Sequence, residues 1–506
     1  MKKLLCSISL LSGVFVLAQQ EKDTTVQSKH IDEIIVSGVK KYAEKKSDYV
    51  AKMPLKNLEN PQVYTVLPKE LMQQQVATDL QSSLNLLPGV NNVSVSVGSG
   101  GVGLGLTMRG FSSNASAGAL RNGMATNFVS LSDPVNLEAI EVIKGPSGTL
   151  FGSALLVGYG GFVNRVTKKP LHQFKGEIGY TAGSWSSNRV TVDVSTPLNK
   201  SKTFLARLNA AYNNDGSFQD YGKSKSVAIA PSFSFKVNDR LDINLDFEYF
   251  DISRNTTYMG LITGKDVTFK DKSINDFNLD KKISYASDEI QSKAKIFNTF
   301  ATANYKISDN WVSQTSFSSA KTENDANYLF LNLSNKGTIR RDYYHIPSTF
   351  NLTEIQQNFI GNFNISDKIT NKILVGIDYT TTKTTDKRGV VSDIDRKIYT
   401  MKSKDKTDIG FVPIAFNNEN SPYISQAAYQ EVLWETVYRG YKRDYRNFSV
   451  YVSDVISFSD RLFAMASLRF DNFNSVSDNY RQNSWSPKLG LVYQVVKDKV
   501  SLFGII

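Results

Sequence analysis

The chain has 506 residues, a formal net charge of +11 and an aromatic fraction of 11%. Its mean hydropathy of −0.28 is unlike that of a helical membrane protein, in which each span needs about 20 consecutive apolar residues. The length is too great for one small core, so we expect two or more folding units. The basic excess attracts anions, but the sequence contains no recognisable nucleic-acid-binding fold, and we expect no nucleic-acid partner.

The first residues of the chain have the features of a secretory signal peptide, which we place at residues 1–18. Lys2 and Lys3 precede an apolar run, and Ala18 is a small residue before the expected cleavage site. The run is shorter than a membrane-spanning helix. The only cysteine, Cys6, lies within it. We therefore expect an exported mature chain that has no disulfide bond.

A polar stretch follows at residues 19–60, and it contains the sequence IDEIIVSG at residues 31–38. The residues Ile34, Ile35 and Val36 favour extended backbone. An extended and exposed segment of this kind can add a strand to the sheet of a partner protein.

A compact, mixed α/β region is expected at residues 61–170. Residues 78–87 are predicted to form a helix, with Thr78 as its N-cap and Gln81 at the capping-box spacing. The helix is predicted to end before Pro88. The apolar residues on one face of this helix are Leu80, Leu84 and Leu87.

Two further motifs lie in the same region. The sequence LTMRGF occupies residues 106–111, and IEVIKGPSGTLFG occupies residues 140–152. Glycine and proline at residues 145–148 permit a tight turn. The region ends with VTKKP at residues 166–170.

In this order and spacing, the three motifs resemble the plug of TonB-dependent outer-membrane receptors. VTKKP, together with YTVLPKELMQQQ at residues 64–75, resembles the siderophore-receptor branch, of ferrichrome type. The resemblance implies a TonB box formed by Ile31, Asp32, Glu33, Ile34, Ile35, Val36, Ser37 and Gly38. It also implies structural plug residues, which are Arg109, Gly110, Phe111, Glu141, Lys144, Gly145, Pro146 and Gly152.

The charged members of the plug motifs are expected to form ion pairs that fasten the plug to the barrel wall. These residues are Arg109, Glu141 and Lys144. The family usually has arginine before the glycine of the Gly-Pro turn, where this chain has Lys144. The replacement loses the planar guanidinium, which binds a carboxylate through two parallel hydrogen bonds.

From about residue 174 onward, apolar and polar residues alternate. At residues 241–249 the apolar face carries leucine, isoleucine and aromatic residues, and the other face carries Asp242, Asp246 and Glu248. The same alternation occurs at residues 204–212. It predicts strands of a transmembrane β-barrel, with apolar side chains toward lipid and charged side chains toward a wet lumen.

The connections between these strands alternate in length. Short polar turns are predicted at residues 198–202, 238–240, 308–310, 366–368, 459–461 and 497–499. Long connections are predicted at residues 251–292, 321–352 and 380–446. This alternation is typical of the periplasmic and extracellular ends of an outer-membrane barrel.

We therefore predict a mainly β protein in which a mixed α/β plug lies inside an antiparallel barrel, with the barrel at residues 171–506. We count about 13 strands, whereas the resemblance implies a barrel of about 22. An open sheet in lipid would leave backbone groups unpaired. We accordingly expect that this sequence is a truncated gene product, a split reading frame or an incomplete record.

The resemblance implies a receptor in the cell outer membrane that imports a ferric siderophore with energy supplied through the TonB protein. It implies no enzymatic activity and no cofactor, and we expect a monomer surrounded by outer-membrane lipid. Aromatic and cationic residues together suit a flat anionic chelate. The candidate ligand contacts are Ser112, Asn127, Phe128, Trp434, Tyr438, Arg439, Tyr441 and Arg443.

Several alternatives remain open at this point. The cargo could be cobalamin, haem or an oligosaccharide. The chain could also be a non-transporting remnant that acts as a surface protein, or a passive porin, although a plug argues against the porin. The three histidines, His30, His172 and His345, are scattered and do not have metal-ligand spacing, so we predict no metal site.

Overall fold

The structure is a computed structural model of the 506-residue chain. The chain divides into two units, residues 1–41 and 42–506, and everything described below belongs to the second unit. The described residues are 46–47, 49, 52–53, 55–98, 101–113, 120–126, 132–145, 148–152, 160–255, 260–263, 282, 284, 288, 290–333, 338–391, 414–415 and 438–506. The expected signal peptide and TonB box lie outside them, as do Pro146, Asn127, Phe128 and Trp434.

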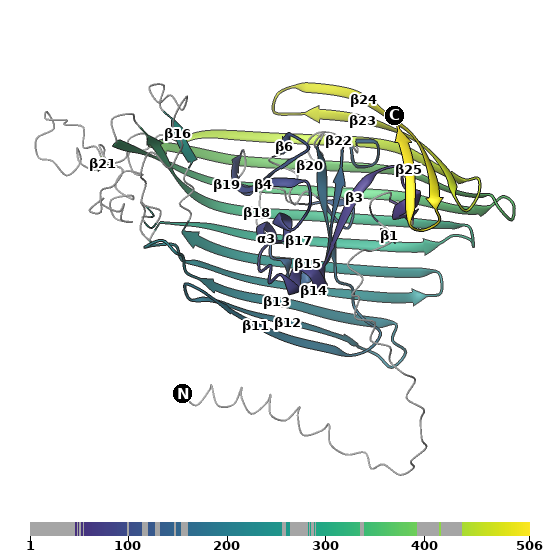
Figure 1. Ribbon diagram of the computed structural model, residues 1–506, viewed down its shortest axis with the longest axis horizontal. Helices are drawn as coiled ribbons and strands as arrows, with labels where there is room; N and C mark the ends of the chain where they lie inside the picture. The colour runs from purple at the N-terminus through teal and green to yellow at the C-terminus, as the bar shows by residue number, and fades with distance from the viewer. Residues whose placement is uncertain are drawn as a thin grey trace, which may run out of the picture. The chain divides into compact units, whose positions relative to one another are not determined.

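One large sheet contains most of the described residues, and we call it the wall. Thirteen strands follow one another along it, each antiparallel to the next, with β11 and β25 at its two edges (Figure 1). These strands are β11 (Lys175–Gly183), β12 (Ser187–Pro197), β13 (Phe204–Asp215), β14 (Ser224–Asn238), β15 (Leu241–Asn255), β17 (Gln291–Lys306), β18 (Trp311–Leu333), β19 (Thr338–Asn364), β20 (Thr370–Val391), β22 (Tyr438–Ser457), β23 (Leu462–Ser475), β24 (Tyr480–Val496) and β25 (Val500–Ile505). The predicted number of strands is confirmed.

Two short strands pair with the wall near its long connections. β16 (Gly260–Thr263) runs parallel to β18, and β21 (Ile414–Ala415) runs antiparallel to β19. Both lie between strands of the main path in sequence and extend the sheet only locally.

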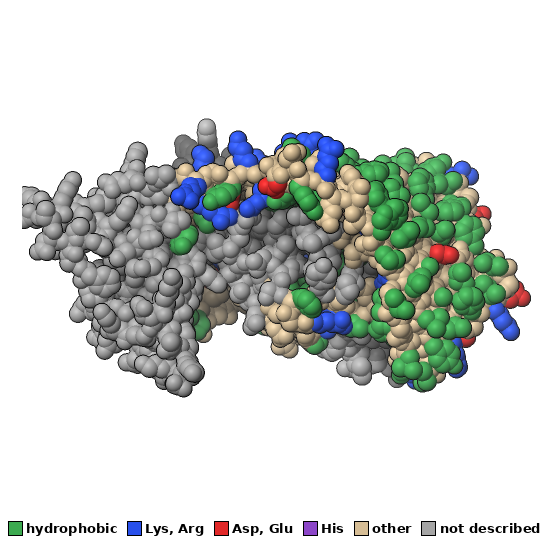
Figure 2. All heavy atoms as spheres, turned by 90° about the horizontal axis from the view of Figure 1, so that it is seen from above, with side chains coloured by type: hydrophobic (Ala, Val, Ile, Leu, Met, Phe, Trp, Pro, Cys, Tyr) green, Lys and Arg blue, Asp and Glu red, His purple; other side chains and the backbone are tan. Residues whose placement is uncertain are grey.

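The two faces of the wall differ as the alternation predicted. On β13, Arg207 and Asn209 are buried, whereas Leu208 and Tyr212 are more than 40% exposed. On β15, Glu248 is completely buried. Figure 2 shows apolar side chains covering much of the outer face at one end, with lysine and arginine gathered farther along. Successive residues of a strand point to opposite faces, so this pattern separates an apolar outer face from a polar inner one.

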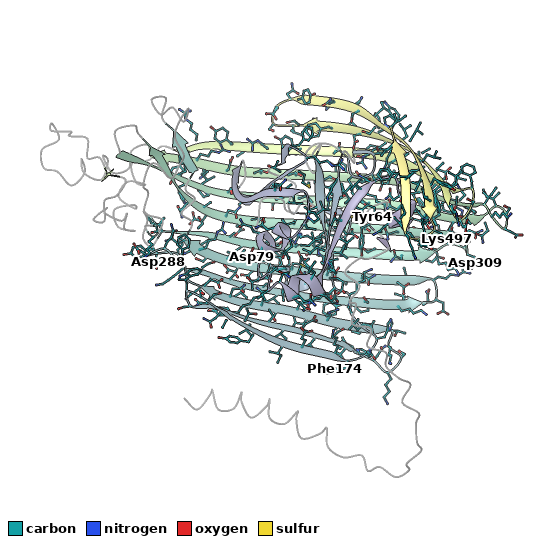
Figure 3. The ribbon with its side chains drawn as sticks, viewed as in Figure 1. Tyr64, Asp79, Phe174, Asp288, Asp309 and Lys497 are labelled. Carbon is teal, nitrogen blue, oxygen red and sulfur yellow. The ribbon has the colours of Figure 1, made fainter. Side chains whose placement is uncertain are left out.

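All six predicted short turns join neighbouring strands at one end of the wall. Figure 3 shows Asp309 and Lys497 at that end and Asp288 at the opposite one. The predicted bounds of the long connections were wrong, because the strands continue farther. β18 and β19 pair from residue 311 to residue 361. β20 ends and β22 begins within the predicted loop 380–446. Threonine, tyrosine and valine in these segments favour strand structure, and paired neighbours extend it.

The plug, which we define as the described residues from 46 to 170, contains three small sheets. The five-stranded sheet has the order β3 (Val63–Pro68), β9 (Leu137–Lys144), β10 (Gly161–Thr167), β7 (Leu120–Arg121) and β8 (Met124–Ala125), and only the β10–β7 pair is parallel. A second sheet joins β4 (Val90–Gly98), β5 (Gly101–Met108) and β6 (Phe111–Ser113), and the third pairs β1 (Lys46–Ser47) with β2 (Leu55–Lys56).

The helices of the plug are short. They are η2 (Asn57–Glu59), α2 (Lys69–Gln74), α3 (Leu80–Asn85), η3 (Pro134–Asn136) and α4 (Gly148–Phe151). The helix predicted at residues 78–87 is α3, but the predicted cap was wrong. Asp79 is the N-cap, and its carboxylate accepts a hydrogen bond from the Ser82 amide at 2.7 Å. Aspartate is at least as good a cap as threonine, and here it lies one residue nearer the first helical turn.

The core of the plug lies between its main sheet and its helices. Strand β9 is buried over most of its length, as a central strand covered on both faces should be. The buried apolar residues of this cluster include Leu67, Met72, Leu80, Leu84, Leu106, Ile140, Val142 and Val163. In the described part of the chain, no helix combines the length and hydrophobicity that a membrane span requires.

Candidate functional site

The contact between the plug and the wall combines apolar clusters with buried charged groups. Arg121, the last residue of β7, donates from Nε to Glu248 of β15 at 2.8 Å and lies 3.4 Å from Asp246. Its guanidinium also stacks over the ring of Phe300 at 3.9 Å. Both Arg121 and Glu248 are almost entirely shielded from water. The pair therefore fixes the plug sheet against strands β15 and β17.

Glu248 collects further donors from both sides of the interface. Asn136 of the plug and Asn298 of the wall donate to its two oxygens at 2.7 and 2.9 Å. A buried carboxylate is stable only when its charge and its lone pairs are satisfied. The plug supplies much of that compensation here, so the wall is electrostatically complete only with the plug in place.

Arg165 lies beside Arg121, because the two residues are partners in the parallel β10–β7 pair. Its guanidinium donates to the Ser132 hydroxyl at 2.9 Å, and its Nε has no hydrogen-bond partner among the described residues. Burial lowers the pKa of Arg165, and the charge of Glu248 opposes that shift. The negative charge of Glu248 therefore stabilises the charged forms of both Arg121 and Arg165.

A second group of contacts lies along β12 and β13. Asp133 of the plug accepts two hydrogen bonds from Arg189 of the wall, both at 2.8 Å. Lys168, at the end of the plug, lies 2.9 Å from Asp193. Arg207 completes this group by pairing with Asp193 at 2.7 Å. In one of these ion pairs the plug supplies the anion, and in the other it supplies the cation.

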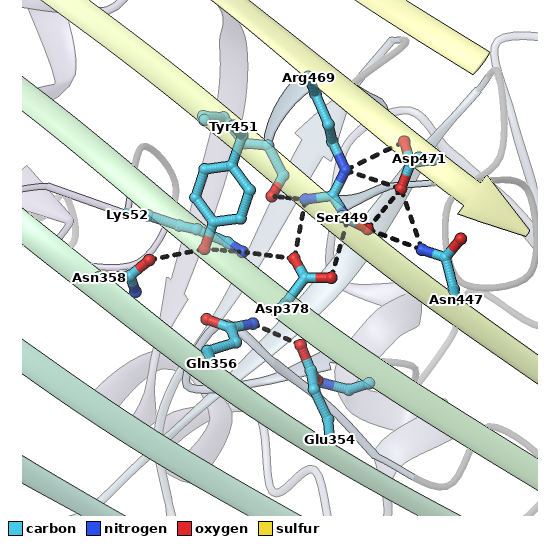
Figure 4. A network of polar contacts seen from close by, with 12 residues as sticks. Lys52, Glu354, Gln356, Asn358, Asp378, Asn447, Ser449, Tyr451, Arg469 and Asp471 are labelled. Atoms are coloured by element: carbon cyan, nitrogen blue, oxygen red, sulfur yellow. Dashed lines mark hydrogen bonds and ion pairs between the residues drawn. The ribbon is translucent and has the colours of Figure 1, made fainter. Parts of the chain in front are cut away.

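Lys52 of the plug belongs to a third group of contacts (Figure 4). The wall residues of this group are on strands β19, β20, β22 and β23. Its ammonium group donates to the Tyr451 hydroxyl at 3.3 Å and lies 3.9 Å from Asp378. Burial lowers the pKa of Lys52 to about 8, although Asp378 opposes the shift. Lys52 also has a positive φ of 53°, which is unfavourable for a residue with a side chain.

Arg469 is the central cation of this group. It binds Asp378 through two hydrogen bonds of 2.9 and 3.1 Å and binds Asp471 at 3.0 Å. It also donates to the Leu150 carbonyl of the plug at 3.3 Å. Gly152 lies against it, because an added Cβ at Gly152 would be 2.8 Å from Nη2 of Arg469. Glycine is therefore needed at position 152, because any side chain there would collide with Arg469 of the wall.

The remaining plug-motif residues lie within the plug, and the structure brings several of them together. Glu141 accepts a hydrogen bond from Asn164 at 2.7 Å. Arg109 lies against Gly145 and close to Lys144, whose pKa is lowered by burial and by the charge of Arg109. Neither cation has a carboxylate within 4.0 Å among the described residues, so their expected ion pairs to the wall are not formed there. Gly110 has a φ of +80°, and Phe111 is 53% exposed.

The candidate ligand residues that the structure describes are on strands rather than in loops. Ser112 lies on β6, and Tyr438, Arg439, Tyr441 and Arg443 are at the beginning of β22. By alternation, the last three share a face with Asn447 and Ser449, which are buried against the plug side. Tyr438 points to the opposite face of β22, so the predicted ligand contacts on this strand do not all lie on one face.

Tyr438 takes part in a different cluster. Its hydroxyl is 2.7 Å from Nδ1 of His345, and Nε2 of His345 is 2.5 Å from Asp325. Gly389 lies between His345 and Tyr438 in the register of β19, β20 and β22, and its lack of a side chain leaves room for this contact. The cluster is on the outer face, so it does not line the interior.

The inner face of the same strands carries cations and aromatics. Arg388 of β20 pairs in register with Arg439, binds Asp386 at 2.9 Å and lies 5.0 Å from the ring of Tyr441. Arg443 follows two residues later on the same face. Within the described residues, no group of three histidine, cysteine, aspartate or glutamate side chains could hold a metal ion.

Comparison with known proteins identifies the fold. Residues 56–159 match the TonB-dependent Receptor Plug Domain, and residues 230–504 match the family described as TonB dependent receptor-like, beta-barrel. The chain therefore belongs to the TonB-dependent receptor family, and the predicted plug and barrel are confirmed. Members of this family are transport receptors rather than enzymes.

Individual relatives are similar over parts of the chain. The metal-pseudopaline receptor of Pseudomonas aeruginosa is 33% identical over 121 residues, which are 24% of this chain and 17% of that protein. The ferrioxamine B receptor of Salmonella typhimurium is 28% identical over 200 residues, which are 38% and 28% of the two chains. The chain thus aligns with less than a third of the length of either relative.

Solved structures share the fold at lower identity. The ferric preacinetobactin receptor BauA of Acinetobacter baumannii has a TM-score of 0.75 and 17% identity, with 91% of this chain and 65% of that chain covered. The siderophore receptor PiuA of the same species has a TM-score of 0.74 and 18% identity, with 92% and 66% covered. These likenesses support the architecture alone.

Several interface residues were not predicted from the sequence. Arg121, Asp133 and Arg165 are isolated charges in polar segments, and Lys52 lies in a stretch that seemed to be flexible tail. The ion-pair partners of Lys52, Arg121 and Asp133 are more than 50 residues away, so no local spacing indicates these pairs. The alternation of apolar and polar residues did place Glu248 on the inner face of its strand. It was the one sequence feature that indicated a residue of this interface.

Proposed function

We propose that this protein is an outer-membrane receptor that imports a ferric siderophore with energy supplied through TonB. The proposal is supported by family membership and by the names of the relatives, which are receptors for metal–pseudopaline and ferrioxamine B. The alternating turn lengths and the apolar outer face fit an outer-membrane barrel. An N-terminal signal peptide at residues 1–18 and a TonB box at residues 31–38 belong to the same proposal.

The observation that carries the ligand class is the row of cations and aromatics on the inner face of β20 and β22. Arg388, Arg439, Tyr441 and Arg443 are located there, near the long connections. Guanidinium groups bind anionic oxygens, and tyrosine rings stack on flat ligands. We assign these residues, with Ser112, Asn127, Phe128 and Trp434, to the binding of an anionic ferric chelate, and we remove Tyr438 from that set because of its outward parity.

The mechanism follows from this arrangement. The chelate binds between the long connections and the plug, and binding makes residues 31–38 available on the periplasmic side. TonB adds a strand to this segment and pulls. The plug then shifts or partly unfolds, and the ligand passes. The iron remains held by the chelator, so the protein binds and gates without a cofactor of its own.

The proposal can be tested by ligand binding. Purified protein in detergent is titrated with ferrichrome, ferrioxamine B, a ferric catecholate, haem and cobalamin, and binding is followed by quenching of intrinsic tryptophan fluorescence. Saturable binding of one iron chelate, without binding of haem or cobalamin, is the expected result. Preferential binding of cobalamin or haem would assign the receptor to another cargo.

A further inference from the structure

The inner face of β20 and β22 carries positive charge that the protein itself does not balance. Arg388 and Arg439 are register partners on these neighbouring strands, so their Cα atoms are about 5 Å apart and their side chains leave the same face of the sheet. Like charges directly opposite each other in a sheet are destabilising. Two arginines in this position therefore need an anion between them.

The anion that the chain supplies is Asp386, and it binds only one of the two arginines. Nε and Nη2 of Arg388 both donate to Oδ2 of Asp386, at 3.1 and 2.9 Å. Arg439 and Arg443 have no carboxylate within 4.0 Å in the part of the chain that the structure describes. Three cations and one anion leave this face with an excess of two positive charges.

The wall arginines beside the plug are arranged differently. Arg189, Arg207 and Arg469 each lie near a carboxylate of the protein, at 2.8, 2.7 and 2.9 Å. These three arginines are buried, and a buried charge is stable only when it is paired. Arg439 is exposed and Arg443 is half-buried, so an anion from solution can reach both. The two uncompensated arginines are therefore placed for a ligand rather than for the packing of the plug.

The spacing of these cations fits a whole chelate. Arg439 and Arg443 are four residues apart on one strand, which is about 13 Å at about 3.3 Å per residue. Tyr441 lies between them on the same face, by the alternation of the strand. A ligand that contacts both arginines must therefore cross the side chain of Tyr441.

Aromatic rings accompany the cations. The guanidinium of Arg388 lies 5.0 Å from the centroid of the Tyr441 ring. Tyr445, on the same face of β22, packs against Phe473 of β23 with ring centroids 5.7 Å apart. Flat aromatic ligands stack on such rings or meet them edge to face. Guanidinium groups also stack on electron-rich rings. The face thus offers contacts to rings as well as to negative charge.

Ferric chelates differ in charge and in ring content. Three hydroxamate groups, each with a single negative charge, cancel the charge of the ferric ion and contain no aromatic ring. Three catecholate groups, each with a double negative charge, leave a triple negative charge, and each belongs to an aromatic ring. Carboxylate chelates have negative charge without rings. Guanidinium groups bind anionic oxygens through charge-assisted hydrogen bonds, so the catecholate class matches both features of this face.

We infer that the imported chelate is a ferric catecholate, bound with its negative oxygens on Arg388, Arg439 and Arg443 and with a catechol ring against Tyr441. This inference rests on the proposed function, because it names the class of siderophore that the same site takes. A neutral hydroxamate chelate leaves Arg439 and Arg443 without an anion and therefore binds more weakly.

The test compares three iron chelates on the full protein in detergent, by equilibrium dialysis with radioactive iron. The probes are ferric enterobactin, which is a catecholate, ferrichrome, which is a hydroxamate, and ferric citrate, which is anionic but has no aromatic ring. Ferric enterobactin should bind roughly a hundredfold more tightly than ferrichrome and roughly tenfold more tightly than ferric citrate.

The possible results separate this inference from the proposed function. Ferrichrome bound as tightly as ferric enterobactin, or more tightly, would overturn the catecholate assignment and leave siderophore import standing. Ferric citrate bound as tightly as ferric enterobactin, or more tightly, would show that charge alone is recognised and would also overturn it. Failure of the folded protein to bind any of the three chelates would contradict the proposed function itself.

Variants distinguish recognition of charge from a structural role. Arg439→Gln should weaken binding of ferric enterobactin roughly tenfold and leave binding of ferrichrome unchanged, and Arg439→Lys should recover part of the loss. Tyr441→Leu should weaken binding of ferric enterobactin but not of ferric citrate. Lys387→Gln is the control, because Lys387 is an exposed neighbour of Arg388 on the opposite face of β20. Equal losses for ferric enterobactin and ferrichrome in Arg439→Gln would overturn the inference.

Thermal unfolding shows whether each variant is folded. If Arg439→Gln does not fold, the salt dependence of the wild-type protein decides the question. Added salt should weaken binding of ferric enterobactin and leave binding of ferrichrome nearly constant, because salt screens the attraction between exposed charges. The same salt dependence for both chelates would contradict recognition of the chelate by its charge.

Discussion

Arg121 and Glu248 form a salt bridge of 2.8 Å that joins the plug to the wall at a point almost inaccessible to water. The two residues are 127 positions apart in sequence. Asn136 and Asn298 donate to the same carboxylate. The plug therefore supplies the positive charge and a hydrogen bond that a buried carboxylate of the wall needs.

Arg121→Met should destabilise the seating of the plug by about 3–5 kcal/mol, because it leaves Glu248 buried without its closest cation. Urea unfolding followed by hydrogen exchange in plug peptides measures the change. The matched control, Lys69→Met, breaks a partly exposed ion pair and should cost less than about 1 kcal/mol. Equal effects for the two variants would show that Arg121 is not an anchor.

Gly152→Ala should destabilise the protein by about 2–3 kcal/mol, because the new Cβ meets Arg469 and the backbone has a positive φ. Arg469 cannot easily move aside, since Asp378 and Asp471 hold it. Gly110→Ala is the control, with the same φ of +80° and open space around it. It should cost about 1 kcal/mol. Thermal unfolding measures the loss of stability in both variants. The loss in Gly110→Ala reports the backbone strain alone, and the additional loss in Gly152→Ala reports the clash with Arg469.

The stability of the plug should depend on pH through Lys52. Burial lowers the pKa of Lys52 to about 8, whereas the unfolded lysine titrates near 10.5. Between these values the unfolded chain holds a proton that the folded protein has released, so the free energy of unfolding rises with pH, by up to about 3 kcal/mol. Below pH 8 both states are protonated and this contribution is constant.

Urea unfolding between pH 7 and pH 10 measures this dependence as a difference between the wild-type protein and Lys52→Met. The variant should lose the rise above pH 8, and Lys69→Met should keep it. A rise that persists in Lys52→Met would have to come from another group.

The N-cap of α3 gives a small, local prediction. Asp79→Ala should cost about 1 kcal/mol, because the Ser82 amide loses its acceptor. Thr78→Ala should stay within about 0.5 kcal/mol, since Thr78 is not the cap. Chemical denaturation of the two variants compares them directly, and the reverse order would restore the cap predicted from the sequence.

The inner-face cations should control ligand affinity. Arg443→Ala is expected to weaken binding of the ferric chelate roughly tenfold or more, about 1.4 kcal/mol, through loss of a charge-assisted contact. Lys442→Ala is the matched control, because Lys442 is the next residue and points to the other face. Tryptophan-quenching titrations measure both affinities. Similar losses in the two variants would argue for a general charge effect.

The sequence predicted the architecture well where a repeated local pattern determines it. The alternation at residues 241–249 and the short turns between strands were sufficient for the wall. The motif glycines were recognised, but only the structure shows that Gly152 accommodates Arg469, because that contact joins residues more than 300 positions apart. Strand lengths were underestimated, since pairing with neighbours carries β18, β19, β20 and β22 into segments that look like loops.

The candidate site was predicted less well for a physical reason. Sequence alone placed Tyr438, Arg439, Tyr441 and Arg443 in one loop, where side chains have no fixed direction. On a strand, neighbouring residues point to opposite faces, and Tyr438 is therefore bound to His345 on the outside. Knowing the register is what separates ligand candidates from outer-face residues.

The central claim is import of a ferric siderophore that depends on TonB. The most direct measurement is uptake of radioactive iron, presented as ferrichrome, ferrioxamine B or a ferric catecholate, by cells in which this protein is the only siderophore receptor. The account predicts saturable uptake from one chelate that disappears when TonB is deleted. Uptake that continues without TonB, or no uptake from any chelate by cells that display the folded protein, would contradict it.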